Sequence, residues 1–329
     1  MTLATLIAEP WQDYGLVDSG HGRKLERYGR FRFIRPEPQA MWAPASDNWR
    51  ADGEFVPASD EDGGGRWHLD ANVPDEGWPL GWEDVRFQAQ CTPFRHLAFF
   101  PDMASHWGWM REFLSDSTYR SSAAPARSPS RPPNQGTLMG GREGERAGAA
   151  ISREGNSDKP ECLNLFGYTG VGSLALAAKG AKVTHVDASK KSVEAGKANA
   201  LLSDMRDLPI RWLVDDAAKF AAREVRRGRR YDGIMLDPPK WGRGPKKELW
   251  QLEEGLPGLI ADCAKLLDAD SRFLVLTVYA VRMSALAIGE LVSQSLDHLG
   301  GQFECGEMAV REEARGLTLP TAIFARWSR

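Results

Sequence analysis

Asn164-Leu-Phe-Gly-Tyr-Thr-Gly-Val-Gly172 is the stretch that decides the fold of this chain. It continues a short apolar run that starts at Cys162, and a helical pattern extends from Val171 to Lys179. A strand that passes into a helix over several glycines is typical of the first βα corner of an open α/β sheet, where ligands bind. Glycines let a ligand approach the backbone closely, and the helix start offers free N–H groups. The stretch therefore predicts a ligand site, with G-x-x-G-x-G spacing instead of the G-x-G-x-x-G of dinucleotide enzymes.

The sequence after this corner alternates strand patterns with helix patterns. Strand-like runs lie at 182–186, 210–214, 231–236 and 272–277, and helical stretches lie at 189–203, 217–226, 246–267 and 283–296. Such an alternation predicts a parallel, doubly wound sheet. The tail differs, because residues 302–310 and 318–327 face each other without a helix between them, which predicts an antiparallel pair at the sheet edge. The expected fold class is α/β, a doubly wound and mostly parallel seven-stranded sheet with a smaller β-rich N-terminal domain.

Composition restricts the class of protein. The 329 residues are 42% hydrophobic and 26% charged with a formal net charge of −3, which excludes collagen-like, disordered and disulfide-framework proteins. The longest apolar runs, such as 273–281, are about half the ~20 residues of a membrane span, and the first twenty residues carry no Lys or Arg. The four cysteines form no CxxC pair. We expect a cytoplasmic protein with no membrane contact and no metal site, and the oligomeric state stays open.

The chain divides into three segments of different composition. Residues 1–114 hold eight of the twelve tryptophans and short alternating runs, which predicts a small β-rich domain for substrate recognition or packing. We expect those tryptophans to pack in the core and between domains, with a base-stacking platform as the alternative. Residues 115–158 are rich in Pro, Ser, Gly and Arg and predict a flexible linker or insertion. Residues 159–329 form the α/β domain.

Two carboxylates follow the second and third expected strands. Asp187 ends the second strand, where a carboxylate accepts both hydroxyls of a ribose. The alternative for Asp187 is a helix N-cap, a position for which Ser189 is better suited. Asp216 follows the third strand and is placed to accept the amino group of an adenine, with the N-cap of the next helix as the competing interpretation.

The most specific pattern is Asp237-Pro-Pro-Lys240, which follows the fourth expected strand. Two prolines fix the backbone and remove two donors, so we expect the carbonyls of this turn to stay free as acceptors. A rigid acidic turn that faces a nucleoside-binding corner suits a planar, hydrogen-bonding acceptor group. Enzymes that use NAD have no need of such a turn at this place.

These residues resemble the class I S-adenosylmethionine-dependent methyltransferases, and more narrowly the bacterial RlmI/RlmK-like group that methylates large-subunit ribosomal RNA. The resemblance covers about 161–329 and rests on the first corner, Asp187-Ala-Ser189, Asp216 and the Asp-Pro-Pro-Lys turn. Phe99-Phe-Pro-Asp102 is similar to the family's Phe-x-Asp-Gln-Arg segment, but the Gln and Arg are absent. The first 110 residues do not resemble the family's usual RNA-binding module. The implied fold is a Rossmann-like methyltransferase, and the implied cofactor is S-adenosyl-L-methionine.

The resemblance also implies roles for individual residues. The methionine and sulfonium end of the cofactor would contact Asn164, Phe166, Gly167, Tyr168, Thr169 and Gly170. The nucleoside end would contact Asp187, Ala188, Ser189 and Asp216. The catalytic residues would be Asp237, Pro238, Pro239 and Lys240. Beside these, we expect Trp241, Arg243, Lys246 and Tyr279 to bind the substrate, although Tyr279 is equally compatible with a core position.

The reaction expected from this site is direct, in-line transfer to a nitrogen of an RNA base. An amine or ring nitrogen needs a positioned acceptor such as Asp237. Methylation of cytosine at carbon 5 needs a cysteine nucleophile, and neither the Asp237 turn nor 277–280 contains one. Cys162 and Cys263 look structural. The alternatives are a methyltransferase of a small molecule or protein, an NAD-dependent oxidoreductase, and a binding protein without turnover.

Overall fold

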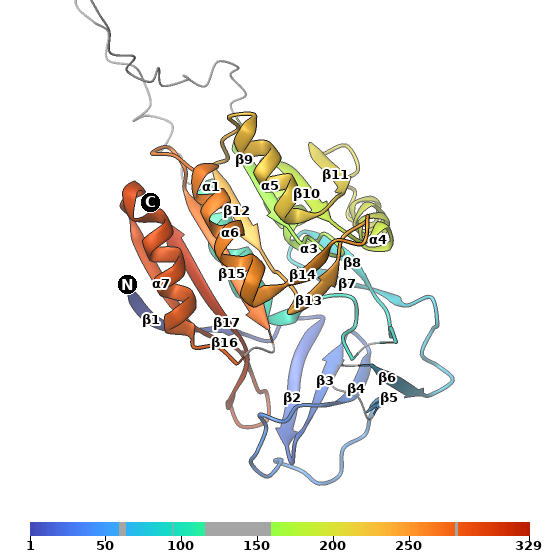
Figure 1. Ribbon diagram of the computed structural model, residues 1–329. Coiled ribbons are helices and arrows are strands. Elements are labelled where there is room, and N and C mark those ends of the chain that lie inside the picture. The colour runs from blue at the N-terminus through green and yellow to red at the C-terminus, as the bar shows by residue number, and fades with distance from the viewer. Residues whose placement is uncertain (59–63, 94, 116–158, 280–281) are drawn as a thin grey trace, which may run out of the picture.

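The computed structural model describes residues 1–58, 64–93, 95–115, 159–279 and 282–329. It consists of a large sheet with helices on both faces and a smaller β-rich part (Figure 1). The expected linker, 115–158, lies outside the described residues except for Ser115, which ends a helix. The division of the chain into three domains therefore stays a prediction.

The large sheet has eight strands in the order β1-β16-β17-β15-β12-β9-β10-β11. Its parallel central strands are β9 (Glu161–Leu165), β10 (Lys182–Asp187), β11 (Ile210–Val214), β12 (Gly233–Leu236) and β15 (Phe273–Tyr279). β17 (Thr318–Ser328) runs antiparallel between β15 and β16 (Gln302–Arg311). The mostly parallel α/β sheet and the antiparallel pair in its tail are thus confirmed. All four residues of β12 are buried, as is usual for a parallel strand that is covered on both faces.

Helices cover both faces of this sheet. One face carries α5 (Ala217–Arg226), α6 (Leu252–Lys265) and α7 (Ala285–Leu296), which lie side by side in Figure 1. The other face carries α1 (Ala104–Ser115), α3 (Val171–Ala177) and α4 (Lys190–Leu202). Each face encloses its own apolar cluster, with Phe220 in one and Leu174 in the other. None of the helices in the described ranges has the length and apolar character needed to span a membrane.

The sheet has one strand more than the seven that the sequence predicts. The additional strand is β1 (Thr2–Ala8), which pairs in parallel with 304–310 of β16. These residues belong to the segment that was assigned to the N-terminal domain. The difference arises because the local pattern of a strand does not specify its partner, and this partner lies at the other end of the chain.

Gly306 of β16 is the position on which the pairing with β1 depends most. A Cβ at Gly306 would lie 1.8 Å from the carbonyl oxygen of Ala4, its register partner in β1. We expect Gly306→Ala to displace β1 and to lower the free energy of unfolding by about 1–3 kcal/mol, measured by urea unfolding. Gly258→Ala is the control, because Gly258 is exposed on α6 with nothing within 4 Å of its Cβ position. That change should stabilise by about 0.5–1 kcal/mol, and an unaltered stability of Gly306→Ala would contradict the expectation.

The smaller part contains a five-stranded sheet and a separate hairpin. The sheet is formed by β2 (Tyr14–Gly20), β3 (Arg23–Tyr28), β4 (Phe31–Pro36), β5 (Gly53–Pro57) and β6 (Gly65–Leu69). The hairpin is formed by β7 (Trp78–Trp82) and β8 (Val85–Ala89). Trp78, Trp82 and Trp107 are buried, and four further tryptophans of the first 115 residues pack against the same cluster: Trp11, Trp42, Trp67 and Trp109. The aromatic side chains therefore serve packing, as expected.

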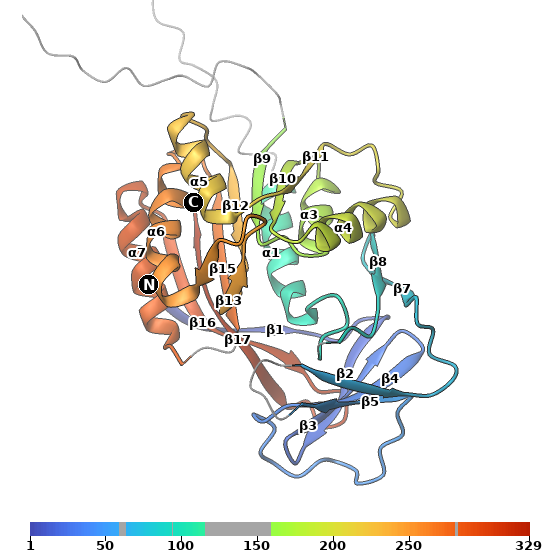
Figure 2. The ribbon, with the colours of Figure 1, turned by 45° about the vertical axis from the view of Figure 1, so that its right-hand side comes forward.

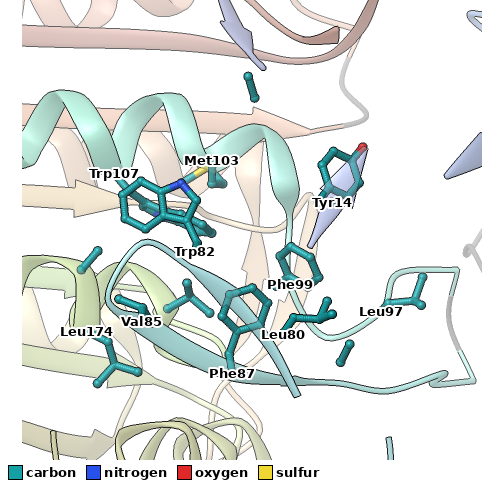
Figure 3. Close-up of a cluster of buried hydrophobic side chains, with 14 of the residues drawn as sticks. Tyr14, Leu80, Trp82, Val85, Phe87, Leu97, Phe99, Met103, Trp107 and Leu174 are labelled. Carbon is teal, nitrogen blue, oxygen red and sulfur yellow. The ribbon is translucent and has the colours of Figure 1, made fainter. Parts of the chain in front are cut away.

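One apolar cluster joins the β-rich part to the large sheet. Figure 3 shows Trp82, Phe87 and Phe99 in the same cluster as Leu174 of α3. Helix α1 also contributes to this junction, because the Trp107 ring packs edge to face against the Trp82 ring, with 5.2 Å between the ring centroids. The carbonyl of Phe113 at the other end of α1 accepts a hydrogen bond from Arg272. The first 115 residues thus supply both a strand and a helix to the larger layered part (Figure 2).

Candidate active site

The corner between β9 and α3 has an unusual backbone. Phe166 and Tyr168 have φ angles of 58° and 48°, in the left-handed region that bulky side chains rarely adopt. Such residues cost about 1–3 kcal/mol each, persist where surrounding contacts fix them, and concentrate at ligand sites. Here the Tyr168 amide donates to Asp187 at 2.8 Å, and the Thr169 hydroxyl donates to the Ala98 carbonyl at 2.7 Å. The corner is therefore held from β10 on one side and from the N-terminal segment on the other.

A pocket with about 350 Å³ of empty space, part of it open to solvent, lies over this corner. Seven of the predicted site residues line it: Asn164, Phe166, Gly167, Tyr168, Thr169, Gly170 and Asp237. The corner and the Asp237 turn, which are far apart in the sequence, thus form one site, as expected for the carboxyl ends of neighbouring parallel strands.

The other half of the lining was not predicted. It consists of Phe99, Phe100, Met103, Trp107, Val171, Gly172 and Met235. Four of these come from the 3-10 helix Pro101–Met103, the residues before it and the first turns of α1, and three of them are labelled in Figure 3. The only indication in the sequence was the likeness of Phe99-Phe-Pro-Asp102 to a segment of the methyltransferase family. Nothing in the pattern of α1 itself indicated that it forms a wall of the pocket.

Asn164 is held by a chain of buried polar groups. Its Nδ2 donates to Ser173 Oγ at 2.9 Å, and Ser173 Oγ lies 3.0 Å from His185 Nδ1. Burial lowers the pKa of His185 to about 3, so this imidazole is neutral. These contacts hold the Asn164 side chain against α3 and β10. Its Oδ1, buried in the pocket wall, has no hydrogen-bond partner among the described residues.

Asp187, Ala188 and Ser189 lie beside the pocket and do not line it. The two carboxylate oxygens of Asp187 accept from the Tyr168 and Ser189 amides, each at 2.8 Å. Burial raises the pKa of Asp187, and these two hydrogen bonds oppose the increase. Ser189 is the N-cap of α4, because its Oγ accepts from the Ser192 amide at 3.2 Å. The ribose contact of Asp187 stays a prediction.

Asp216 occupies the N-cap position of α5. Its Oδ1 accepts from the Lys219 amide at 2.9 Å, which is the competing role that the sequence left open. Its Oδ2 would lie 3.0 Å from a Cβ on Gly244, so this carboxylate lies next to the loop after the Asp237 turn. Asp216 does not line the pocket, and its contact with an adenine stays a prediction.

Asp237 stands at the end of β12, where it lines the pocket. Burial raises the pKa of Asp237 to about 8, and the negative charges of Asp102 and Asp187 add to the increase. Pro238 after it is buried, whereas Pro239 and Lys240 are exposed. A carboxyl group with this pKa changes protonation near neutral pH, which is the property required of a general base or acid.

The expectation that the carbonyls of this turn stay free is wrong for two of them. The Pro239 carbonyl accepts from Trp250 Nε1 at 2.7 Å, and the Lys240 carbonyl accepts from the Leu252 amide at 3.1 Å. The physical reason is that the chain reverses direction after the turn. Residues 250–252 therefore return to it and place the indole N–H of Trp250 and the amide of Leu252 next to these two oxygens. The prolines still stiffen the turn, but its acceptor in the pocket is the side chain of Asp237.

A short hairpin follows the turn and leaves several of the predicted substrate-binding residues on the surface. It consists of β13 (Trp241–Arg243) and β14 (Leu249–Gln251). The Trp241 side chain is 56% exposed, and Arg243 and Lys246 are exposed beside it. The buried Trp250 ring lies 5.1 Å from that of Phe166 and so ties the hairpin to the pocket wall.

Tyr279 takes a different position from the hairpin residues. Its hydroxyl donates to Asp102 Oδ2 at 2.9 Å, and the same oxygen accepts from Thr321 at 2.7 Å. Its ring lies 5.0 Å from that of Phe100. Tyr279 does not line the pocket, so these contacts favour the core position, and a contact with substrate stays a prediction.

The sheet order, the glycine-rich corner and the acidic diproline turn together define a Rossmann-like methyltransferase of class I. The crystal structure of an S-adenosylmethionine-dependent methyltransferase from Agrobacterium tumefaciens superposes on the whole molecule with a TM-score of 0.82. The two chains are 36% identical over 99% of this chain and 95% of that one. This chain belongs to the S-adenosylmethionine-dependent methyltransferases, and its cofactor is S-adenosylmethionine.

Curated relatives match a smaller part of the chain. A ribosomal RNA large subunit methyltransferase I from Tolumonas auensis is 38% identical over 80 residues, which are 24% of this chain and 20% of that protein. A ribosomal RNA large subunit methyltransferase K/L from Pseudoalteromonas translucida is 34% identical over 92 residues, 28% of this chain and 13% of that protein. The matched region thus spans a fifth or less of these relatives. No protein-family model matches the chain.

The pocket has the chemistry that this cofactor requires. Two glycines allow close packing at the corner, since a Cβ on Gly167 would lie 2.4 Å from His185 and one on Gly172 would lie 2.9 Å from Met235. The wall contains one buried acceptor and one buried donor without partners among the described residues, Asn164 Oδ1 and Trp107 Nε1. A ligand with amino, carboxylate and nucleoside groups satisfies such atoms, whereas an apolar ligand leaves them unpaired.

Proposed function

We propose that this protein transfers a methyl group to a nitrogen of an RNA base, with ribosomal RNA as the acceptor. The observation that carries the proposal is the Asp237 turn, which faces the pocket and leads directly into a hairpin with exposed Trp241, Arg243 and Lys246. Relatives that match part of the chain are named as methyltransferases of large-subunit ribosomal RNA, which supports this acceptor class. An acceptor of this kind implies a cytoplasmic enzyme.

The side chains of the pocket have two roles, which are binding the cofactor and binding the acceptor. When bound, S-adenosylmethionine supplies a methyl group on a positively charged sulfur. Asn164 and the corner residues hold the cofactor end of the site, and the stiff Asp237 turn holds the acceptor end. The Asp237 carboxylate accepts an N–H of the base and takes up the proton that the nitrogen loses. Its pKa of about 8 suits this role, because a general base is most effective when its pKa is near the working pH.

The cysteines argue for nitrogen as the methylated atom. Methylation of cytosine at carbon 5 requires a thiolate that adds to the ring. None of the residues that line the described pocket is a cysteine. Cys162 and Cys263 are fully buried, and burial raises the pKa of both thiols. Burial also raises the pKa of Cys91 to about 12.

The hairpin is suited to bind the nucleic acid. Arginine and lysine neutralise phosphates, and an exposed indole stacks on an unpaired base. Arg243, Lys246 and Trp241 present these groups on one exposed loop next to the acceptor end of the pocket. Lys219 and Glu248, which are 2.9 Å apart, link the same loop to α5.

The acceptor class is tested by following a labelled methyl group. The enzyme is incubated with tritiated S-adenosylmethionine and with RNA, protein or metabolite extracts from cells that lack this gene. We expect label in ribosomal RNA of the deletion strain and little in RNA of the parent strain, whose sites are already methylated. Nucleoside mass spectrometry then identifies the modified base. Label in the protein or metabolite fraction would refute an RNA acceptor.

A variant of the hairpin should affect RNA binding alone. We expect the double change Arg243→Ala and Lys246→Ala to raise the KM for RNA and to reduce the slope of log K against log salt by about one per lost phosphate contact. The Kd of S-adenosylhomocysteine should stay unchanged. The matched control is Lys179→Ala with Lys265→Ala, two exposed lysines that follow or end helices α3 and α6. An equal effect of both double variants would point to net charge instead of the hairpin.

A further inference from the structure

Two buried polar atoms in the pocket wall stand out because they have opposite hydrogen-bonding character. Trp107 Nε1 is a donor only, and Asn164 Oδ1 is an acceptor only. The two side chains are 3% and 1% exposed, and neither atom has a partner among the described residues. A buried polar group without a partner costs about 1–3 kcal/mol. Two such groups in the wall of one pocket indicate a ligand that pairs with both.

Contacts within the protein hold both side chains in place. The Asn164 side chain is held by its bond to Ser173, in which Nδ2 donates to Oγ at 2.9 Å. The Trp107 ring packs edge to face on Trp82 at 5.2 Å. A Cβ on Gly172 would lie 3.3 Å from Trp107 Nε1. Gly172, which also lines the pocket, thus packs close to the indole N–H.

We propose that Trp107 and Asn164 together recognise the amino-acid end of the cofactor. That end carries a carboxylate, which only accepts hydrogen bonds, and an ammonium group, which only donates them. Trp107 Nε1 donates to the carboxylate, and Asn164 Oδ1 accepts from the ammonium group. The resemblance to the methyltransferase family already implied a contact from Asn164. Trp107 is new, and it comes from helix α1, ahead of the methyltransferase sheet in the sequence.

The test compares two ligands that differ only at this end. S-adenosylhomocysteine carries the amino and carboxylate groups, and 5′-methylthioadenosine has the same thioether and nucleoside without them. Trp107→Phe removes the N–H and keeps an aromatic ring against Trp82. Titration calorimetry without any acceptor should show the Kd of S-adenosylhomocysteine raised about 10-fold or more, as for a lost bond to a charged group. The Kd of 5′-methylthioadenosine should stay within about twofold.

Trp78→Phe is the matched control, because the Trp78 indole donates to the Tyr28 carbonyl at 3.0 Å in the β-rich part. It should leave both Kd values unchanged. An equal loss for both ligands in Trp107→Phe would show a merely structural role, and no loss for either would show that the N–H does not meet the ligand. Either result overturns the proposal.

A second measurement uses the unaltered protein and does not depend on the folding of a variant. With ¹⁵N-labelled tryptophan, one indole resonance should shift on addition of S-adenosylhomocysteine and move much less with 5′-methylthioadenosine. If the indole resonances respond in the same way to both ligands, the proposal is wrong. Neither experiment involves RNA, so their outcome is independent of the acceptor proposed above.

Discussion

Asp237→Asn is expected to lower the rate of methyl transfer about 100-fold or more, the usual effect of losing a general base. Asparagine has nearly the same shape and retains an oxygen that accepts an N–H, but it cannot take up the proton from the base nitrogen. The rate is measured in single turnovers at saturating cofactor and RNA. The Kd of S-adenosylhomocysteine should change little, because the proposed role concerns the acceptor. Asp207→Asn, at an exposed position, controls for the loss of one charge.

The pH dependence gives an independent check of the same residue. The ionised form of Asp237 is the active one, so kcat/KM, which reports the free enzyme, should rise with pH through the pKa of about 8. The profile of Asp237→Asn should be flat over this range. Full turnover in the variant, or an unaltered profile, would show that Asp237 does not act as the base.

Stability should follow the opposite trend. The pKa of Asp237 is raised in the folded protein, from about 3.9 in the unfolded chain to about 8. Between these values the folded state binds more protons than the unfolded state, so the free energy of unfolding falls as pH rises, and the loss is complete above about pH 8. Asp237→Asn removes this contribution. Melting temperatures from pH 5 to 9 should therefore show the variant gaining stability relative to the unaltered protein as pH rises.

Gly170→Ala is expected to produce the largest loss of cofactor affinity among single-methyl changes. Gly170 has a φ of 79° and begins helix α3. A Cβ there would lie 2.9 Å from the Trp212 ring and 3.2 Å from the Cα of Gly196. The left-handed conformation adds about 1–2 kcal/mol of strain for alanine, and the overpacking adds about 1–3 kcal/mol. The corner should move, and the Kd of S-adenosylhomocysteine should rise at least about tenfold.

Gly180→Ala separates these two causes. Gly180 has a φ of 89°, but nothing lies within 4 Å of its Cβ position. It should lose stability through strain alone and bind S-adenosylhomocysteine with unaltered affinity. Calorimetric titration and thermal unfolding of both variants provide the comparison. If the two variants bind the ligand equally well, the close packing around Gly170 does not shape the pocket.

The parts of the fold that could be predicted are those with a local pattern. The central parallel strands are apolar runs between helical stretches, and the first corner carries its glycines next to one of them. Topology then places the end of β12 beside the end of β9, with which it pairs. For this reason Asp237 and Asn164 could be assigned to one site from sequence alone, and both line the pocket.

The parts that could not be predicted depend on contacts between distant segments. The partner of β1 is β16, and the local sequence of either strand does not indicate which strand it pairs with. Trp107 lies in a helix whose apolar residues fit any buried surface, and only its packing against α3 and Trp82 brings it to the pocket. The roles of Asp187 and Asp216 were harder for another reason. Their oxygens accept from backbone amides, and the sequence offers both this role and a ligand contact without deciding between them.

The pairing of β1 with β16 has a consequence for engineering this enzyme. A chimaera that joins residues 159–329 to a different leader would leave β16 with an open hydrogen-bonding edge, which invites association with other chains. It would also lack α1 and with it the Trp107 side of the pocket. A replacement for the first 115 residues must therefore bring an edge strand for β16 and a helix that completes the pocket wall.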